Sequence, residues 1–356
     1  MRSLTWDEVR ARRLSRGHLL ERAPAARLVE VVRDVCGLHA QVMGSAELQL
    51  AARVEGITQE DVRAALWERR ELAKTWTLRG TLHLHPSNEL RLWTAARSAV
   101  VGEADHVSDG LEDVDEVVAA IGHALAGNRL TREELADAVA ALVGPEPREK
   151  LASGWGYYLG DAAAAGLLCF GPSQGAKVTF VHPDDWLGPQ HAWVPQEALR
   201  EVARRYAEAY GPVTYRQFRQ WFSSRGLGVD DARRLFDELD LADVEPPSRV
   251  GSSVRLLPEY DVYVMGFRER DHLVPPAVRE QVAAHGKGRY EGPAGTPFLL
   301  VDGICAGIWS RRKGAKEVEL TVVPARTLAP DEQAGVGAEA ERIGAFYGLE
   351  PRLTIA

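Results

Sequence analysis

The sequence has little of what marks secreted, membrane or metal-binding proteins. Its 356 residues contain only three cysteines, Cys36, Cys169 and Cys305, which are far apart. An odd number at this spacing fits neither a disulfide framework nor a zinc cluster. No apolar run approaches the ~20 residues of a membrane-spanning helix, and the N-terminal residues lack the apolar core of a secretory signal. We therefore expect a cytoplasmic protein with no membrane partner, no metal and no cofactor.

Basic residues are also fewer than acidic residues. Lys and Arg number 43 against 51 Asp and Glu, which gives a net charge of −8. This balance counts against nucleic-acid binding, because phosphate contacts need Lys and Arg. The average does not show how the charges are distributed, however. With 45% hydrophobic and 26% charged residues, the composition is that of a globular protein of two or three domains.

Several common catalytic motifs are missing. The sequence has no Walker loop, no dinucleotide-binding G-x-G-x-x-G after a strand, no H-E-x-x-H and no G-x-S-x-G. These absences argue against the usual nucleotide-binding, zinc-protease and serine-hydrolase classes.

What the sequence does have is a repeated order of elements. Three helix starts share a capping pattern, Thr58-x-x-Asp61, Thr131-x-x-Glu134 and Thr214-x-x-Gln217. Around them, helices followed by a hairpin recur every ~75–90 residues, a length that indicates domains rather than solenoid units. Three helices closed by a β-hairpin are typical of a winged helix. The alternative is that capped helices look alike by chance.

We therefore predict an α+β protein of tandem winged helices with a C-terminal β-rich segment. The predicted domains are residues 1–102, 114–190, 195–270 and 271–356, with the acidic stretch Glu103–Glu116 as the first boundary. Strands are expected from about Leu241 to Phe267. The last segment should contain a hairpin with an Asp302-Gly303 turn, a basic turn, a third strand over 318–323 and a closing helix near 330–346.

Two basic clusters could contact phosphate despite the net charge. The first helix carries Arg12, Arg13 and Arg16, and the predicted basic turn carries Arg311, Arg312, Lys313 and Lys316. A solvated helix face is the other explanation for the first cluster. Four cations at a hairpin tip are harder to explain by solubility alone.

The segment His39-Ala40-Gln41 is the most specific candidate for a catalytic site. In an extended backbone, residues i and i+2 project to one side, so an imidazole and a carboxamide would converge. His39 could accept a proton or hold a water molecule, and Gln41 could orient that water. The plainer alternative is a histidine at a helix end and a capping glutamine.

Several blocks, in order along nearly the whole chain, resemble the AlkZ/YcaQ-type bacterial DNA glycosylases. They are Arg10–Leu14, Leu38–Gln41 with Leu48–Arg53, Trp76–Leu84 containing Arg-Gly-Thr-Leu-His-Leu, Leu256–Asp261 with Gly266–Arg270, and Val301–Trp309. The family's usual catalytic motif is Gln-Φ-Gln or Gln-Φ-Asp. With His39 in the first position, this sequence resembles the His-Φ-Gln subgroup, which is associated with actinobacterial strains that make or meet DNA-alkylating natural products.

The resemblance implies a monofunctional DNA glycosylase that excises bulky N7-alkylguanine, with His39 and Gln41 catalytic. It also implies winged helices in a C shape around a basic DNA channel, with Arg79 among the DNA contacts, and a hairpin that probes the lesion. We expect a monomer acting on double-stranded DNA, in repair or genotoxin self-resistance. Whether interstrand crosslinks are unhooked stays open. The alternative is a non-catalytic winged-helix regulator, although such proteins usually dimerise on palindromes.

Overall fold

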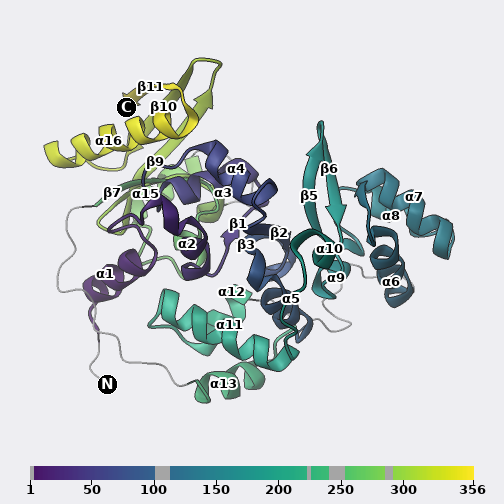
Figure 1. Ribbon diagram of the computed structural model, residues 1–356. Helices are drawn as coiled ribbons and strands as arrows, with labels where there is room; N and C mark the ends of the chain where they lie inside the picture. Colours follow the sequence, from purple (N-terminus) through teal and green to yellow (C-terminus); the bar gives the residue numbers. More distant parts are fainter. Residues whose placement is uncertain (1–3, 101–112, 223–225, 240–252, 285–291) are drawn as a thin grey trace. The chain divides into compact units, whose positions relative to one another are not determined.

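The computed structural model describes residues 4–100, 113–222, 226–239, 253–284 and 292–356. The chain forms two compact units that alternate along the sequence (Figure 1). The first unit comprises Met1–Val62, Tyr206–Val213 and Leu241–Ala356, and the second comprises Arg63–Arg205 and Thr214–Asp240. These boundaries do not coincide with the four consecutive segments expected from the sequence. Helices and strands occur in both units, so the predicted α+β class is confirmed.

The first unit contains most of the N-terminal helices and all of the C-terminal strands. Its elements are α1 (Trp6–Arg16), α2 (Leu28–Asp34), β1 (Leu38–His39), α3 (Met43–Ala51), β7 (Val254–Leu257), α14 (Val262–Met265), α15 (Pro276–Ala284), β8 (Phe298–Val301), β9 (Ile304–Lys313), β10 (Glu317–Pro324), α16 (Pro330–Tyr347) and β11 (Glu350–Ile355). Helices α4 (Gln59–Trp67) and α11 (Pro195–Tyr210) each cross from one unit to the other.

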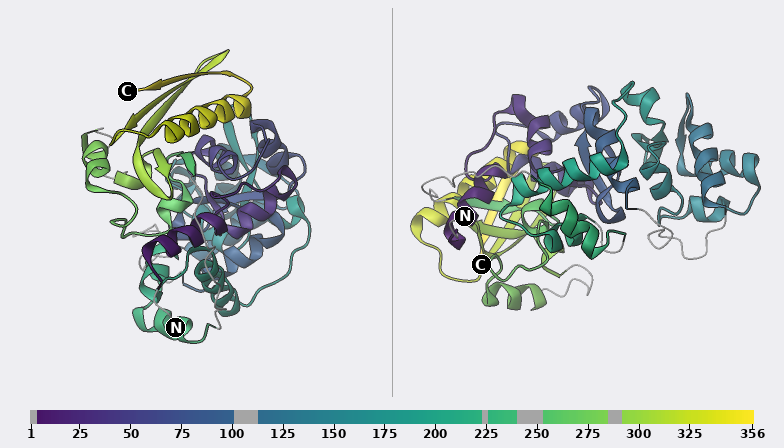
Figure 2. Two further views of the ribbon diagram at one scale, coloured as in Figure 1. Left: turned by 90° about the vertical axis from the view of Figure 1, so that its left-hand side faces the viewer. Right: turned by 90° about the horizontal axis from the view of Figure 1, so that it is seen from below.

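The C-terminal strands form one sheet in the order β11-β10-β9-β8-β7. Strands β10 and β11 are parallel and the other pairs antiparallel. Helix α16 packs against β7, β10 and β11, and α15 packs against β9 (Figure 2). The predicted Asp302-Gly303 turn joins β8 to β9, with φ of 48° and 79° at these residues. Both values suit a type I′ hairpin turn, and the expected C-terminal hairpins and closing helix are confirmed.

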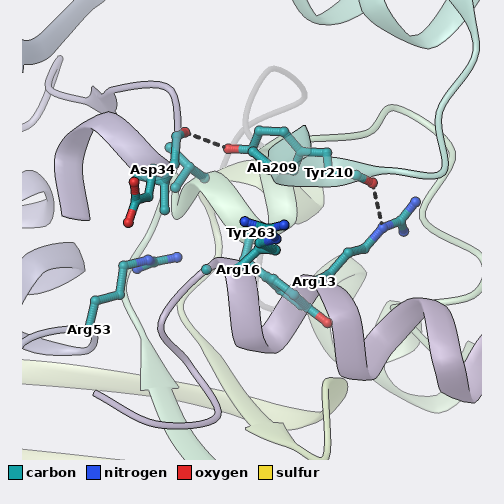
Figure 3. Close-up of a pocket in the computed structure, with 10 residues that line it drawn as sticks. Arg13, Arg16, Asp34, Arg53, Ala209, Tyr210 and Tyr263 are labelled. Atoms are coloured by element: carbon teal, nitrogen blue, oxygen red, sulfur yellow. Dashed lines mark hydrogen bonds between the residues drawn. The ribbon is translucent and has the colours of Figure 1, made fainter. Parts of the chain in front are cut away.

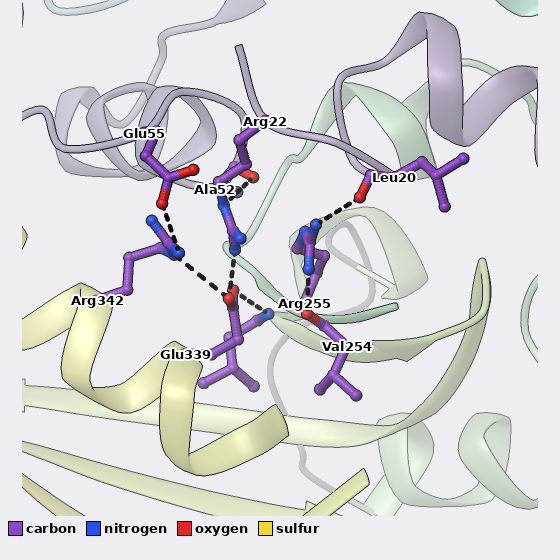
Figure 4. A network of polar contacts seen from close by, with 9 residues as sticks. Leu20, Arg22, Ala52, Glu55, Val254, Arg255, Glu339 and Arg342 are labelled. Carbon is purple, nitrogen blue, oxygen red and sulfur yellow. Dashed lines mark hydrogen bonds and ion pairs between the residues drawn. The ribbon is translucent and has the colours of Figure 1, made fainter. Parts of the chain in front are cut away.

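A polar network fastens α16 to the rest of the first unit (Figure 4). Glu339 on α16 pairs with Arg22 and accepts a hydrogen bond from the backbone nitrogen of Leu256 on β7, at 3.4 Å. Arg342, one turn later, pairs with Glu55 at 3.5 Å. Because Glu339 is almost fully buried, its charge needs these donors.

The predicted strands between Leu241 and Phe267 are largely wrong where the structure describes them. Residues 241–252 lie outside the described residues. Strand β7 pairs with β8 and so belongs to the C-terminal sheet rather than to a third wing. The next residues form helix α14, because the Asp261 carboxylate accepts a hydrogen bond from the backbone nitrogen of Tyr263 and caps the helix at its start.

The second unit contains the clearest winged-helix order. Its elements are β2 (Leu72–Trp76), β3 (Leu82–Pro86), α5 (Leu90–Ser98), α6 (Val114–Leu125), β4 (Arg129–Thr131), α7 (Arg132–Val143), α8 (Arg148–Ala152), α9 (Leu159–Ala164), β5 (Cys169–Gln174), β6 (Lys177–Val181), α10 (Pro183–Leu187), α12 (Tyr215–Phe222) and α13 (Val229–Asp237). Strand β4, between the first two helices, pairs with β6 in a sheet of order β4-β6-β5. This arrangement is consistent with the winged helix predicted for 114–190.

Local sequence explains where these helices begin and end. The predicted capping pattern forms at Thr58, Thr131 and Thr214, and a further capping box forms at Thr5. Each satisfies otherwise unpaired backbone donors. Helix α1 ends where the chain turns at Gly17, and His18 then adopts a φ of 53°. Helices α8 and α9 are separated by a turn in which Gly156 adopts a φ of 79°. Across the described residues, no helix combines the length and apolarity required to span a membrane.

The core of the winged-helix segment yields a stability prediction. The Phe180 side chain on β6 is fully buried and packs edge-on against Phe170 with 5.1 Å between ring centroids. Phe180→Ala should lower the free energy of unfolding by about 3–5 kcal/mol, because it leaves a cavity. Val178→Ala on the same strand is the matched control, since Val178 is 37% exposed. Chemical denaturation measures both; equal losses would contradict the difference in burial between the two positions.

Candidate active site

The His39-Ala40-Gln41 segment lies between α2 and α3 in the first unit. After α2, Cys36 and Gly37 adopt φ of 63° and 88°, which turns the chain into the short strand β1. His39 ends this strand and is only 5% exposed, whereas Gln41 follows in an exposed bend. The extended backbone is thus confirmed at His39 but ends before Gln41. Convergence of the two side chains stays a prediction.

His39 is held by groups from two other parts of the unit. The Gln49 side chain, buried on α3, donates a hydrogen bond from Nε2 to the His39 carbonyl at 3.0 Å. The Tyr260 ring lies against the imidazole, with 5.0 Å between centroids and 32° between planes. The strand position and the Gln49 hydrogen bond fix the backbone of His39, and the Tyr260 ring limits the rotation of the imidazole.

A fully buried ion pair joins α3 to the segment that carries Tyr260. Arg53, just after α3, donates from Nη1 and Nη2 to the two carboxylate oxygens of Asp261 at 2.8 and 2.7 Å. Both side chains have no exposed surface. This two-point geometry is the strongest that an Arg–carboxylate pair adopts. The ion pair therefore fixes the position of Asp261, the residue after Tyr260.

A second ion pair fixes the residue before Tyr260. Arg311 on β9 donates from Nη1 and Nη2 to the Glu259 carboxylate at 2.9 and 3.0 Å. Both side chains are less than one-fifth exposed. Burial would lower the pKa of Arg311, but the hydrogen bond and charge of Glu259 raise it above the ordinary value. The Ser45 hydroxyl on α3 also donates to the Glu259 carbonyl.

The cations of the β9–β10 hairpin therefore fall into two groups. Arg311 faces inward on Glu259, while the Arg312 side chain is 80% exposed and pairs with Glu319 across the hairpin. Lys313 is exposed, with its ammonium 3.1 Å from Gln59 Oε1 and over the Tyr347 ring at 4.5 Å. Lys316 is exposed in the turn. The predicted basic tip thus consists of Arg312, Lys313 and Lys316.

The three arginines of α1 also differ from one another. Arg13 is buried, donates from Nε to the Tyr210 carbonyl at 2.9 Å and lies 3.7 Å from the Phe267 ring centroid. Its Nη1 is 3.1 Å from His272 Nε2. Burial lowers the pKa of Arg13 to about 10, and burial with the charge of Arg13 lowers that of His272 to about 4. A neutral His272 can accept this bond, so the structure does not favour Arg13 as a phosphate contact.

Arg12 is half-buried and Arg16 is exposed at the end of α1. Arg13 and Arg16 also border a small cavity that Asp34, Arg53, Tyr210 and Tyr263 complete (Figure 3). Its volume is about 10 Å³, room for a single water molecule. This cavity cannot hold a nucleobase.

Arg79, the remaining predicted DNA contact, belongs to the second unit. It follows β2 with a φ of 56°, and its guanidinium donates to the Trp221 carbonyl on α12. This contact joins the β2–β3 connection to α12 within that unit. Its role as a DNA contact stays a prediction.

Sequence reasoning missed the supporting residues of the site. In the sequence, Glu259, Tyr260 and Asp261 lie in one block of the family resemblance, and Gln49 and Arg53 lie in another. Their pairings join positions 208 and 52 residues apart in the chain, which no local pattern indicates. Three of the four paired residues, Arg53, Glu259 and Asp261, lie in largely apolar segments, and a charge in such a segment is a signal of a buried partner. No group of three or more His, Cys, Asp or Glu residues within the described ranges could hold a metal ion.

Comparison with known proteins agrees with this architecture. The sequence model of the family described as DNA glycosylase AlkZ-like matches residues 32–346. An interstrand DNA cross-link repair glycosylase from Streptomyces sahachiroi is 31% identical over 349 residues, covering 90% of each chain. The solved structure of the Streptomyces sahachiroi DNA glycosylase AlkZ matches with a TM-score of 0.84 and 27% identity, covering 100% of both chains.

The fold and these matches define a DNA glycosylase. The chain belongs to the AlkZ-like family of these enzymes. The resemblance seen in the sequence is therefore confirmed, although the comparisons leave the role of each site residue as a prediction.

The buried ion pair gives a second stability prediction. Asp261→Ala should lower the free energy of unfolding by about 3–5 kcal/mol, because Arg53 is left buried without its counter-charge. The matched control is Glu319→Ala, which removes an equally bidentate partner from Arg312 at an exposed position, where the loss should be far smaller. Denaturant unfolding compares the two variants. Similar losses would show that Arg53 finds another partner or water.

Proposed function

We propose that this protein is a monofunctional DNA glycosylase that hydrolyses the N-glycosidic bond of bulky N7-alkylguanine in double-stranded DNA. The observation that carries the proposal is the placement of His39. Its imidazole is buried and oriented by Tyr260, two residues before the exposed Gln41. The match to the Streptomyces interstrand DNA cross-link repair glycosylase supports glycosidic-bond hydrolysis in damaged DNA, including crosslinked DNA.

The proposed chemistry suits a site without a carboxylate nucleophile. An N7-alkylguanine already carries positive charge, so the C1′–N9 bond is weak and the base leaves as a neutral molecule. The enzyme then needs only to stabilise an oxocarbenium-like sugar and deliver water. In this mechanism His39 accepts a proton as the water oxygen bonds to C1′, and Gln41 orients the water. The C1′–N9 electrons leave with the base, and an abasic site remains.

An open binding surface is more suitable for this substrate than a closed base pocket. A crosslinked guanine is tethered to the opposite strand and cannot be swung freely out of the duplex, as many glycosylases require. The tiny cavity beside Arg13 cannot serve as a base pocket. We include the unhooking of interstrand crosslinks in the proposed activity. The proposed biological role is DNA repair or self-resistance to genotoxins, and the proposed enzyme is a monomer that acts in the cytoplasm.

The catalytic roles are tested by substitution. A duplex with a single bulky N7-alkylguanine is incubated with the enzyme and then treated with alkali, which cleaves at abasic sites. His39→Ala and Gln41→Ala should each slow strand cleavage by about 100-fold or more, the usual contribution of a general base or a positioned polar group. Binding of both variants to the duplex serves as the control. Full activity in either would remove that residue from the mechanism, and binding without cleavage by the wild type would favour the regulator.

The exposed cations of the hairpin tip are the proposed phosphate contacts of the first unit, together with Arg12 and Arg16. In this proposal Arg311 supports the site through Glu259 and does not meet phosphate, since its guanidinium is largely buried against that carboxylate, whereas the Arg312 side chain is 80% exposed. Arg13 is likewise committed to internal contacts. Arg79 stays a candidate DNA contact of the second unit.

The salt dependence of binding separates these groups. Each lost phosphate contact should reduce the slope of log K against log salt concentration by about 0.9. The double variant Arg312→Ala/Lys316→Ala should therefore lower the slope by about 1–2, whereas Arg311→Ala should leave it unchanged. Fluorescence titration at several salt concentrations measures both. A drop for Arg311→Ala as large as that for the double variant would contradict the division of the hairpin cations.

A further inference from the structure

We propose that Tyr260 is a positioning residue for the catalytic imidazole of His39, and that the surrounding ion pairs exist to hold Tyr260 in place. The proposal rests on the proposed catalytic role of His39. The juxtaposition of the two rings, 5.0 Å apart, is the starting observation. Tyr260 reaches His39 from a segment more than 200 positions away in the sequence, so its placement depends wholly on tertiary structure.

The backbone at Tyr260 is unusual. Its φ is 60°, in the left-handed region that a bulky side chain rarely occupies and in which it is strained. The conformation is maintained by a hydrogen bond from the Tyr260 backbone nitrogen to the Ala294 carbonyl at 2.7 Å. Strain of this kind persists only where the surroundings enforce it.

The two neighbours of Tyr260 supply that enforcement. Glu259 is fixed by Arg311 from β9 and Asp261 by Arg53 from the end of α3, each through two hydrogen bonds. A residue between two such fixed points has little freedom to change its backbone angles. Both ion pairs are largely or wholly buried, so water does not loosen them.

The same helix fixes both partners of the ring contact. Helix α3 carries Gln49, which donates to the His39 carbonyl, and Ser45, which donates to the Glu259 carbonyl. Thus the same helix holds both His39 and the turn that carries Tyr260 in place. Sites built this way hold catalytic groups within the narrow range that a reaction needs. The Tyr260 ring covers one side of the imidazole and restricts its rotation.

The test compares ring-removing and ring-retaining variants on a duplex with a single bulky N7-alkylguanine. Tyr260→Gly removes the ring and relieves the strain at positive φ. Tyr260→Asn is a second ring-less variant that tolerates this conformation and guards against misfolding of the first. Both should lower the single-turnover rate by about 10–100-fold, because a displaced catalytic group loses alignment. The Kd for the duplex should change by less than about twofold, and Tyr260→Phe should recover most of the rate.

A double-mutant cycle separates positioning from a general structural role. In the His39→Ala background, which retains a slow residual rate, Tyr260→Gly should cost less than a further ~twofold, because the imidazole it positions is absent. An undiminished cost in that background, a wild-type rate in both ring-less variants, or a loss confined to Kd would each overturn the inference. If His39→Ala itself keeps the full rate, the proposed function fails first. If only His39→Ala is slow, the catalytic role stands and the role of Tyr260 falls.

Discussion

The buried pairing of Arg53 with Asp261 is the constraint on which the site depends. A guanidinium and a carboxylate without solvent exposure are stable only when each satisfies the other, since their desolvation is costly. Their distance and orientation are therefore fixed, and with them the relation between the end of α3 and the turn before α14. Helix α3 also holds the His39 carbonyl through Gln49. One ion pair thus sets the geometry between the strand that carries His39 and the turn that carries Tyr260.

Burial divides the cations of this protein by function more sharply than sequence position does. Arg311 and Arg312 are adjacent, yet alternate residues of a strand face opposite sides, so one lies on Glu259 and the other in solvent. The same division separates Arg13 from Arg16 on α1. A net charge of −8 is compatible with DNA binding in these terms. Internal pairs consume several arginines and leave a smaller set of exposed cations, whose number limits affinity for undamaged DNA.

Much of the local structure could be predicted because its causes are local. The capping boxes at Thr5 and Thr131, the Asp302-Gly303 turn and the closing helix depend on residues within one turn of each other. The strands expected before Phe267 could not be predicted correctly, since β7 is defined by pairing with a strand about 45 residues later. The candidate site divides in the same way: His39 and Gln41 form a short motif, whereas Glu259, Tyr260 and Asp261 gain meaning only from distant partners.

The polar character of the site follows from the chemistry proposed for it. A carboxylate beside the reacting sugar would stabilise positive charge but would also attract the cationic N7-alkylguanine before reaction, so part of its effect would be uniform binding that gives no rate. A neutral imidazole and a carboxamide interact weakly with that ground-state charge. In the proposed mechanism their contribution arises as the water proton is transferred, when His39 becomes charged and the base becomes neutral. Such weak, directional groups work only if they are correctly placed, because misalignment removes most of their effect. The proposed mechanism would therefore account for one fully buried ion pair, one largely buried ion pair and a strained backbone beside a candidate catalytic segment that itself carries no permanent charge.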